Sequence, residues 1–272
     1  MVPAGSLILM AVDALLGFAV PVCLAAWLVR KHHASLFTIL VGAGTFCVFA
    51  LVLERIVHQV VLYGPHGAAI LGSTVRYAVY GGLAAGIFEE TGRFLSMKFL
   101  LKKEPSGLLP GVAYGVGHGG AEMLIVFGIT MINNLVISAL INSGQTEILF
   151  SQVPEESAGQ LQAQLDQLQA VGAGALLIGL WERFSALFLH IGLSLLVWAA
   201  VRKGGRWLWL FPAAILLHAL VDAGAVLLQK SVGMVPLELI LTAEAAAVAV
   251  LGYKTGVCVF RRSSLSLRNT LD

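Results

Sequence analysis

The sequence contains few charged residues. Asp, Glu, Lys and Arg make up 12% of its 272 residues, about half of the roughly 25% found in soluble domains. So few charges exclude a soluble globular protein, and the 58% of hydrophobic residues excludes a disordered one. Three cysteines are too few for a disulfide framework. A net charge of +2, with no basic run interleaved with aromatics, gives no indication of a nucleic-acid partner. The class that remains is a polytopic membrane protein.

Long apolar runs are what the sequence has instead. A helix needs about 20 apolar residues to cross the hydrocarbon core. Seven runs meet this length, at about residues 6–29, 35–62, 73–101, 108–141, 172–201, 206–229 and 234–257. Open sheets cannot satisfy their backbone groups in lipid. We therefore predict an all-α protein, a bundle of seven transmembrane helices that forms a single domain over residues 1–272 within the lipid bilayer.

The basic residues predict the orientation of the bundle. Twelve of the 17 Lys and Arg fall on one side of the predicted spans. They are Arg30, Lys31, Lys98, Lys102, Lys103, Arg202, Lys203, Arg206, Lys254, Arg261, Arg262 and Arg268. The positive-inside rule then places the N-terminus outside and the C-terminus in the cytosol. The loop 142–171 has no Lys or Arg and is predicted to be extracytoplasmic. The spacing of Leu161, Leu165 and Leu168 predicts a short amphipathic helix within it, resting on the outer leaflet or on neighbouring helices.

Several ionisable residues lie inside the predicted spans at one depth. Charge at the centre of a membrane helix costs a few kcal/mol on insertion scales, so such residues mark functional sites. Two carboxylates and three histidines lie about 11 to 13 residues from the cytosolic ends of four spans, which corresponds to roughly 16–20 Å. They are Glu89, Glu90, His118, His190 and His218. Three histidines at one depth favour a shared site over separate interhelical hydrogen bonds.

This layer has the composition of a metal or water-activating site. Neutral imidazoles with a carboxylate are the usual ligands of Zn²⁺, and a second carboxylate can take the proton of a bound water. Glu122 follows His118 by four residues and Asp222 follows His218 by four, so each pair shares a helix face. Each acid is either a second ligand or the acceptor that orients its histidine. The predicted metal-site residues are His118, Glu122, His190, His218 and Asp222.

The adjacent glutamates, Glu89 and Glu90, are the candidates for the general base. They lie about 100° apart around the helix, so they cannot both point the same way. Arg93 lies three or four residues beyond them, within reach of either, and is predicted to fix one of them. The sequence leaves open which of the two is the base. Glu182 and Arg183 lie about two turns outside the layer, and we favour an ordinary buried ion pair over support of an outer vestibule.

Four motifs carry a resemblance to a known family. They are EETGR at residues 89–93, HGGAE at 118–122, the histidine at 190 and HALVD at 218–222. This combination resembles the intramembrane glutamate metalloproteases, a superfamily that includes the type II CAAX prenyl proteases, the CPBP proteins and PrsW, and it is most similar to the bacterial YhfC branch. The resemblance implies that a first-motif glutamate activates water and that His118, His190 and His218 hold a metal or the water. It departs from the CAAX pattern in the Glu-Glu-x-x-Arg spacing and in Asp222, where those enzymes have Asn.

We therefore expect a multi-pass protein of the bacterial cytoplasmic (inner) membrane that acts as a metal-dependent intramembrane endopeptidase. Its metal would be divalent, with Zn²⁺ the best match to the donors, and its substrate a membrane protein or peptide. Two other functions could use the same layer. One is a proton or metal-ion transporter, although the sequence shows no paired halves. The other is a non-catalytic membrane scaffold, which could dispense with the paired glutamates.

Overall fold

The computed structural model describes residues 1–268, with side chains to residue 260. Arg261, Arg262 and Arg268 of the predicted cytosolic cluster lie outside the residues whose side chains are described. Helices and their connections account for the whole described part of the chain, which has no strand. The predicted all-α fold is confirmed.

Each of the seven predicted spans is helical. Four spans are single helices: α1 (Ala4–His32), α5 (Thr74–Phe99), α10 (Ala173–Lys203) and α12 (Met234–Arg268). The second span joins α2 (Leu36–Val48), η1 (Phe49–Glu54) and α3 (Arg55–Leu62), and the fourth joins α6 (Leu108–Glu122), η2 (Met123–Ile129) and α7 (Thr130–Asn142). The sixth span joins η4 (Gly205–Trp209) and α11 (Leu210–Leu228). The second and fourth spans each contain a π-helical segment, η1 and η2. The short α4 (Gly67–Leu71) precedes α5.

Six of these helical spans are long and apolar enough to cross a membrane. The seventh, α5, is 26 residues long but carries several charges, among them Glu89, Glu90 and Arg93. The chain is thus an all-α, multi-pass membrane protein. The seven-span count and the orientation stay predictions.

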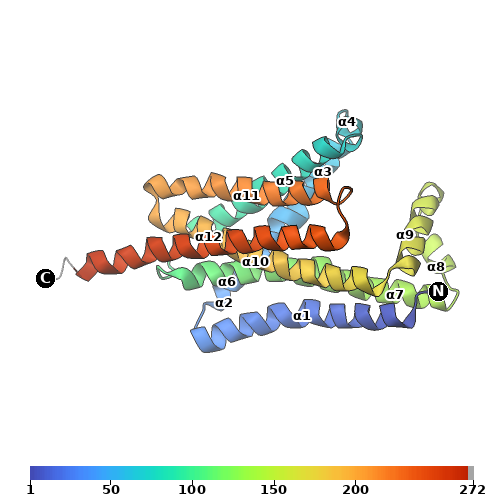
Figure 1. The fold of residues 1–272 in the computed structure, drawn as a ribbon, viewed down its shortest axis with the longest axis horizontal. Helices are drawn as coiled ribbons and strands as arrows, with labels where there is room; N and C mark the ends of the chain where they lie inside the picture. The colour runs from blue at the N-terminus through green and yellow to red at the C-terminus, as the bar shows by residue number, and fades with distance from the viewer. Residues whose placement is uncertain (269–272) are drawn as a thin grey trace.

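The central helix of the bundle is α10. In its most apolar window 72% of the residues are buried, against 17–28% in the other five apolar spans. It packs mainly against α12 and α6, and also contacts α1, α5 and α11 (Figure 1). The second pair of closely packed helices is α5 and α11, and the third is α2 and α6. The four helices that carry the predicted layer, α5, α6, α10 and α11, are therefore neighbours in the bundle.

The N-terminus lies at one end of the bundle, together with the 142–171 segment and the connection from α11 to α12, and the C-terminal end of α12 lies at the other (Figure 1). The segment contains α8 (Glu147–Phe150), η3 (Glu155–Ser157) and α9 (Ala158–Ala170). The predicted short helix is present as α9. It buries Leu165 and packs on α7, and Ser6 Oγ donates to the Val171 carbonyl at 2.9 Å. This helix rests on the bundle itself.

Glycine lets the site helices approach closely. A Cβ at Gly86 on α5 would lie 2.6 Å from the Ile215 carbonyl oxygen of α11, and one at Gly115 on α6 would lie 2.6 Å from Ile191 Cα of α10. Small residues at such contacts are typical of membrane helix pairs, because they let the backbones meet. Close packing of α5 on α11 brings their polar side chains within reach of each other.

Gly86→Val should therefore destabilise the protein by about 1–3 kcal/mol, the usual cost of overpacking, because α11 would have to move away from α5. Thermal unfolding of the purified protein in detergent measures the effect. Gly81→Val on the same helix is the matched control, because a Cβ there has nothing within 4 Å. Equal stability of the two variants would show that this close contact is unimportant.

Candidate metal and catalytic site

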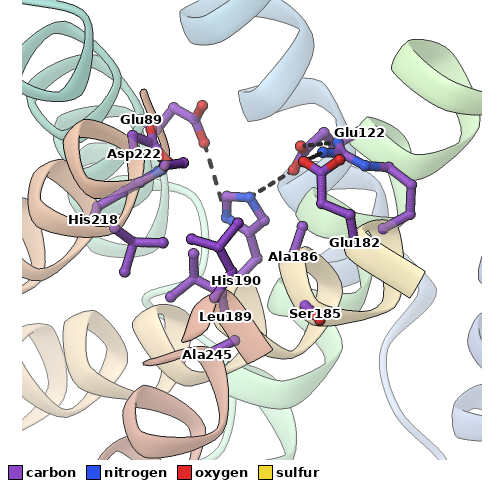
Figure 2. A pocket seen from close by; sticks show the side chains of 14 residues that line it. Glu89, Glu122, Glu182, Ser185, Ala186, Leu189, His190, His218, Asp222 and Ala245 are labelled. Carbon is purple, nitrogen blue, oxygen red and sulfur yellow. Dashed lines mark hydrogen bonds and ion pairs between the residues drawn. The ribbon is translucent and has the colours of Figure 1, made fainter. Parts of the chain in front are cut away.

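The predicted layer surrounds a cavity of about 130 Å³ between α5, α6, α10 and α11, with α12 closing one side (Figure 2). Five of the predicted residues line the cavity. They are Glu89, Glu122, His190, His218 and Asp222. The other three, Glu90, Arg93 and His118, are completely buried behind it. The structure thus brings all eight predicted residues to one region of the bundle.

Glu89 forms a compact group with two of the histidines. His118 Nε2 donates to Glu89 Oε2 at 2.8 Å, and His190 Nδ1 lies 3.9 Å from the same oxygen. One donor atom from each of the three residues lies within 4.8 Å of the others, the spacing of a group that could hold a metal ion. His118 Nδ1 is buried and has no hydrogen-bond partner within the described residues.

Glu90 points away from this group and pairs with Arg93. His218 Nδ1 donates to Glu90 Oε1 at 2.9 Å, and Arg93 Nε lies 3.5 Å from Glu90 Oε2. The Arg93 guanidinium also donates to the carbonyl oxygen and to Nδ1 of His190, both at 3.1 Å. Arg93 is predicted to fix one of the two glutamates. In the structure that partner is Glu90, and His190 is held as well.

The two i,i+4 acids lie beside different histidines. Glu122 shares a helix with His118 but contacts His190, whose Nε2 lies 2.6 Å from Glu122 Oε2. Asp222 lies beside the histidine of its own helix, with Oδ2 3.5 Å from His218 Nε2. Glu122 is the last residue before the π-helical η2, and π-helical segments in α-helices are frequent at functional sites. Glu122 thus contacts the ring of His190, and Asp222 lies beside the ring of His218.

Comparison with known proteins assigns the chain to a family. The family model described as YhfC intramembrane metalloprotease matches residues 16–244. The chain belongs to the YhfC intramembrane metalloprotease family. It is 39% identical to the uncharacterized membrane protein YhfC of Bacillus subtilis (strain 168) over 233 residues, which cover 85% of this chain and 88% of that protein. No solved structure matches the chain significantly.

The YhfC family name implies a metal, and the donors in this member fit one. The Glu89, His118 and His190 group offers a carboxylate and two imidazoles, a usual donor set for Zn²⁺. The unpartnered Nδ1 of His118 is a further buried donor atom. His118 Nε2 and both ring nitrogens of His190 already have protein partners. An ion bound through those atoms would replace these protein contacts with metal–ligand bonds.

Glu182 and Arg183 are part of the site region, whereas the sequence interpretation favoured an ordinary buried ion pair over a role in an outer vestibule. Arg183 donates to Glu122 Oε1 at 2.8 Å and also to Glu182. Both residues line the cavity, together with Ser185. One signal was present in the sequence, because Arg183 precedes His190 by seven residues, which places the two on one helix face. The pair therefore reaches the site through Glu122.

Proposed function

We propose that this YhfC family member is a metal-dependent endopeptidase that cleaves membrane proteins or peptides within the bacterial cytoplasmic membrane. The observation that carries the proposal is the compact group of Glu89, His118 and His190 beside a cavity inside a helical membrane bundle. The cavity leaves room for a water molecule beside a carboxylate within the membrane, and hydrolysis of a peptide bond requires such a water.

The metal would be held by His118 and His190 beside Glu89, and Zn²⁺ is the ion that suits imidazole donors next to a carboxylate. When bound, such an ion polarises a carbonyl oxygen and lowers the pKa of a water molecule. Glu89 acts as the general base. Its Oε2 faces His118, whereas its Oε1 has no hydrogen-bond partner within the described residues, and the side chain lines the cavity. Oε1 is thus the atom placed to accept the proton of the attacking water.

The other predicted residues position this group. Arg93 holds the backbone and the ring of His190, and Glu122 Oε2 lies 2.6 Å from Nε2 of the same ring. Glu90 fixes Nδ1 of His218, so that Nε2 of His218 faces Asp222 at the cavity. His218 can hold water there, and Asp222 can orient it. Glu90 is completely buried and contacts Arg93, which suits a structural role better than that of a base.

Metal analysis of the purified protein tests the proposal. We expect a bound divalent metal and cleavage of a membrane-protein substrate, identified by an unbiased screen, that a chelator abolishes and Zn²⁺ restores. His118→Ala and His190→Ala should lose the metal. Glu122→Gln should lower the affinity for metal about 10- to 100-fold, the usual effect of losing a residue that orients a ligand.

His66→Ala is the matched control, because His66 is exposed and lies outside the site. Its metal content and its cleavage rate should equal those of the wild type. A wild-type protein that binds no divalent metal and cleaves in the presence of chelator would contradict the metal-dependent mechanism. A protein that binds metal and transports it, with no cleavage, would favour the transporter alternative.

A further inference from the structure

A second cavity of about 550 Å³ adjoins the site cavity between α10, α11 and α12. Both cavities are lined by Glu182, Ala225 and Leu241, so they meet at these residues. The second cavity extends from there to Met234, at the start of α12. We call the two joined cavities the outer groove. It runs from the α11–α12 connection to Glu89.

The outer groove is strongly acidic. Five carboxylates line it, and among its described lining residues the single Lys or Arg is Arg183, which Glu122 and Glu182 already pair. The five are Glu89, Glu122, Glu182, Asp222 and Glu238. A cleft lined by charges of one sign concentrates ligands of the opposite sign. The groove therefore suits a cationic ligand.

Glu238 is the strongest single indication of such a ligand. Glu238 is only 2% exposed, and it lines the larger cavity. Ser185 Oγ donates to Glu238 Oε1 at 3.0 Å and Thr242 Oγ1 does so at 3.4 Å, and within the described side chains no Lys or Arg forms an ion pair with it. A buried carboxylate held only by hydroxyl groups is costly unless a cation pairs with it. The groove leaves room for that cation to come from a ligand.

We propose that the outer groove binds the substrate segment as an extended peptide, with a Lys or Arg side chain of the peptide paired with Glu238 and Glu182 beside the bond to be cleaved. This inference rests on the proposed endopeptidase function. An extended peptide suits the groove, because a helix bonds its own backbone groups and would shield the bond from Glu89. The volume of the larger cavity is within the 300–1,000 Å³ typical of ligand pockets.

Charge-selective thiol labelling tests the groove without measuring cleavage. Cys23, Cys47 and Cys258 line neither cavity and are first replaced by Ser. Ala225→Cys then places a thiol where the cavities meet, and Tyr63→Cys, at a residue 84% exposed, is the reference. Each is labelled at neutral pH with a trimethylammonium-bearing and with a sulfonate-bearing methanethiosulfonate. The preference for the cationic reagent should be at least about tenfold greater at position 225, the lower end of effects from charged clefts.

Two further variants identify the groups responsible. In the Ala225→Cys protein, adding Glu182→Gln and Glu238→Gln should remove most of the preference for the cationic reagent. Glu244→Gln is the matched control, since Glu244 is also a carboxylate of α12 but lines neither cavity. It should leave the preference unchanged. An unreactive thiol, equal preferences at positions 225 and 63, or equal effects of the two sets of substitutions would overturn the acidic groove.

Protection distinguishes a peptide from a small cation. A lysine-rich peptide should slow the reaction of the Ala225→Cys thiol with uncharged methyl methanethiosulfonate severalfold, and a peptide with Glu in place of Lys should not. Protection by Mg²⁺ but not by the lysine-rich peptide would overturn the peptide proposal in favour of a cation site. Because no cleavage is measured, a failure here is separate from a failure of the metal and cleavage tests.

Discussion

Glu89→Gln should lower the rate of substrate cleavage by about two to four orders of magnitude, the usual contribution of a general base. Gln has the shape of Glu and can still accept the hydrogen bond from His118 Nε2, which lies 2.8 Å from Glu89 Oε2. It cannot take a proton from water. Because Glu89 lines the cavity and makes no ion pair with Lys or Arg in the described chain, thermal stability should change little.

Cleavage is measured with purified protein in detergent or liposomes, with the substrate found by the screen. Glu244→Gln serves as the control for a neutralised carboxylate that does not line the cavity and should cleave at the wild-type rate. A Glu89→Gln protein that cleaves at the wild-type rate would disprove the role of Glu89 as base. Loss of both cleavage and thermal stability would instead indicate that Glu89 holds the fold together.

The sequence predicts the helices well because bilayer thickness constrains them. Each predicted span is a helix in the structure, and a count of residues from a common edge was enough to bring Glu89, His118 and His190 to one depth. The span that carries the paired glutamates, α5, is the one that an apolarity criterion leaves out. The charges that mark this span as functional also make it less apolar, so a stricter apolarity criterion omits it, although the run at 73–101 is long enough to cross the membrane.

The rotation of each helix is what the sequence leaves open. Glu89 and Glu90 are adjacent, and Arg93 can reach either, so spacing alone cannot assign the pairs. Packing decides, because the close contact at Gly86 brings α5 onto α11, and Glu90 then meets His218. The contact of Glu122 with His190 on another helix, rather than with His118 on its own, likewise depends on tertiary packing.

Glu90→Gln should instead destabilise the protein, by about 3–5 kcal/mol, the usual cost of removing one partner of a buried ion pair. Glu90 and Arg93 are both completely buried, with Arg93 Nε 3.5 Å from Glu90 Oε2. Loss of the Glu90 charge leaves the guanidinium without its carboxylate partner. It also weakens the hydrogen bond that fixes Nδ1 of His218. Thermal and denaturant unfolding of the purified variants measure the effect.

A double-mutant cycle separates this pairing from other effects of the substitutions. Arg93→Met alone should also destabilise the protein, because it leaves Glu90 unpaired and frees the ring of His190. Glu90→Gln combined with Arg93→Met removes both charges, so the loss of stability should be smaller than the sum of the single losses by about 0.5–3 kcal/mol, as for residues in contact. Strict additivity would show that the two residues do not interact. A Glu90→Gln protein that is as stable as the wild type but cleaves no substrate would transfer the role of base from Glu89 to Glu90.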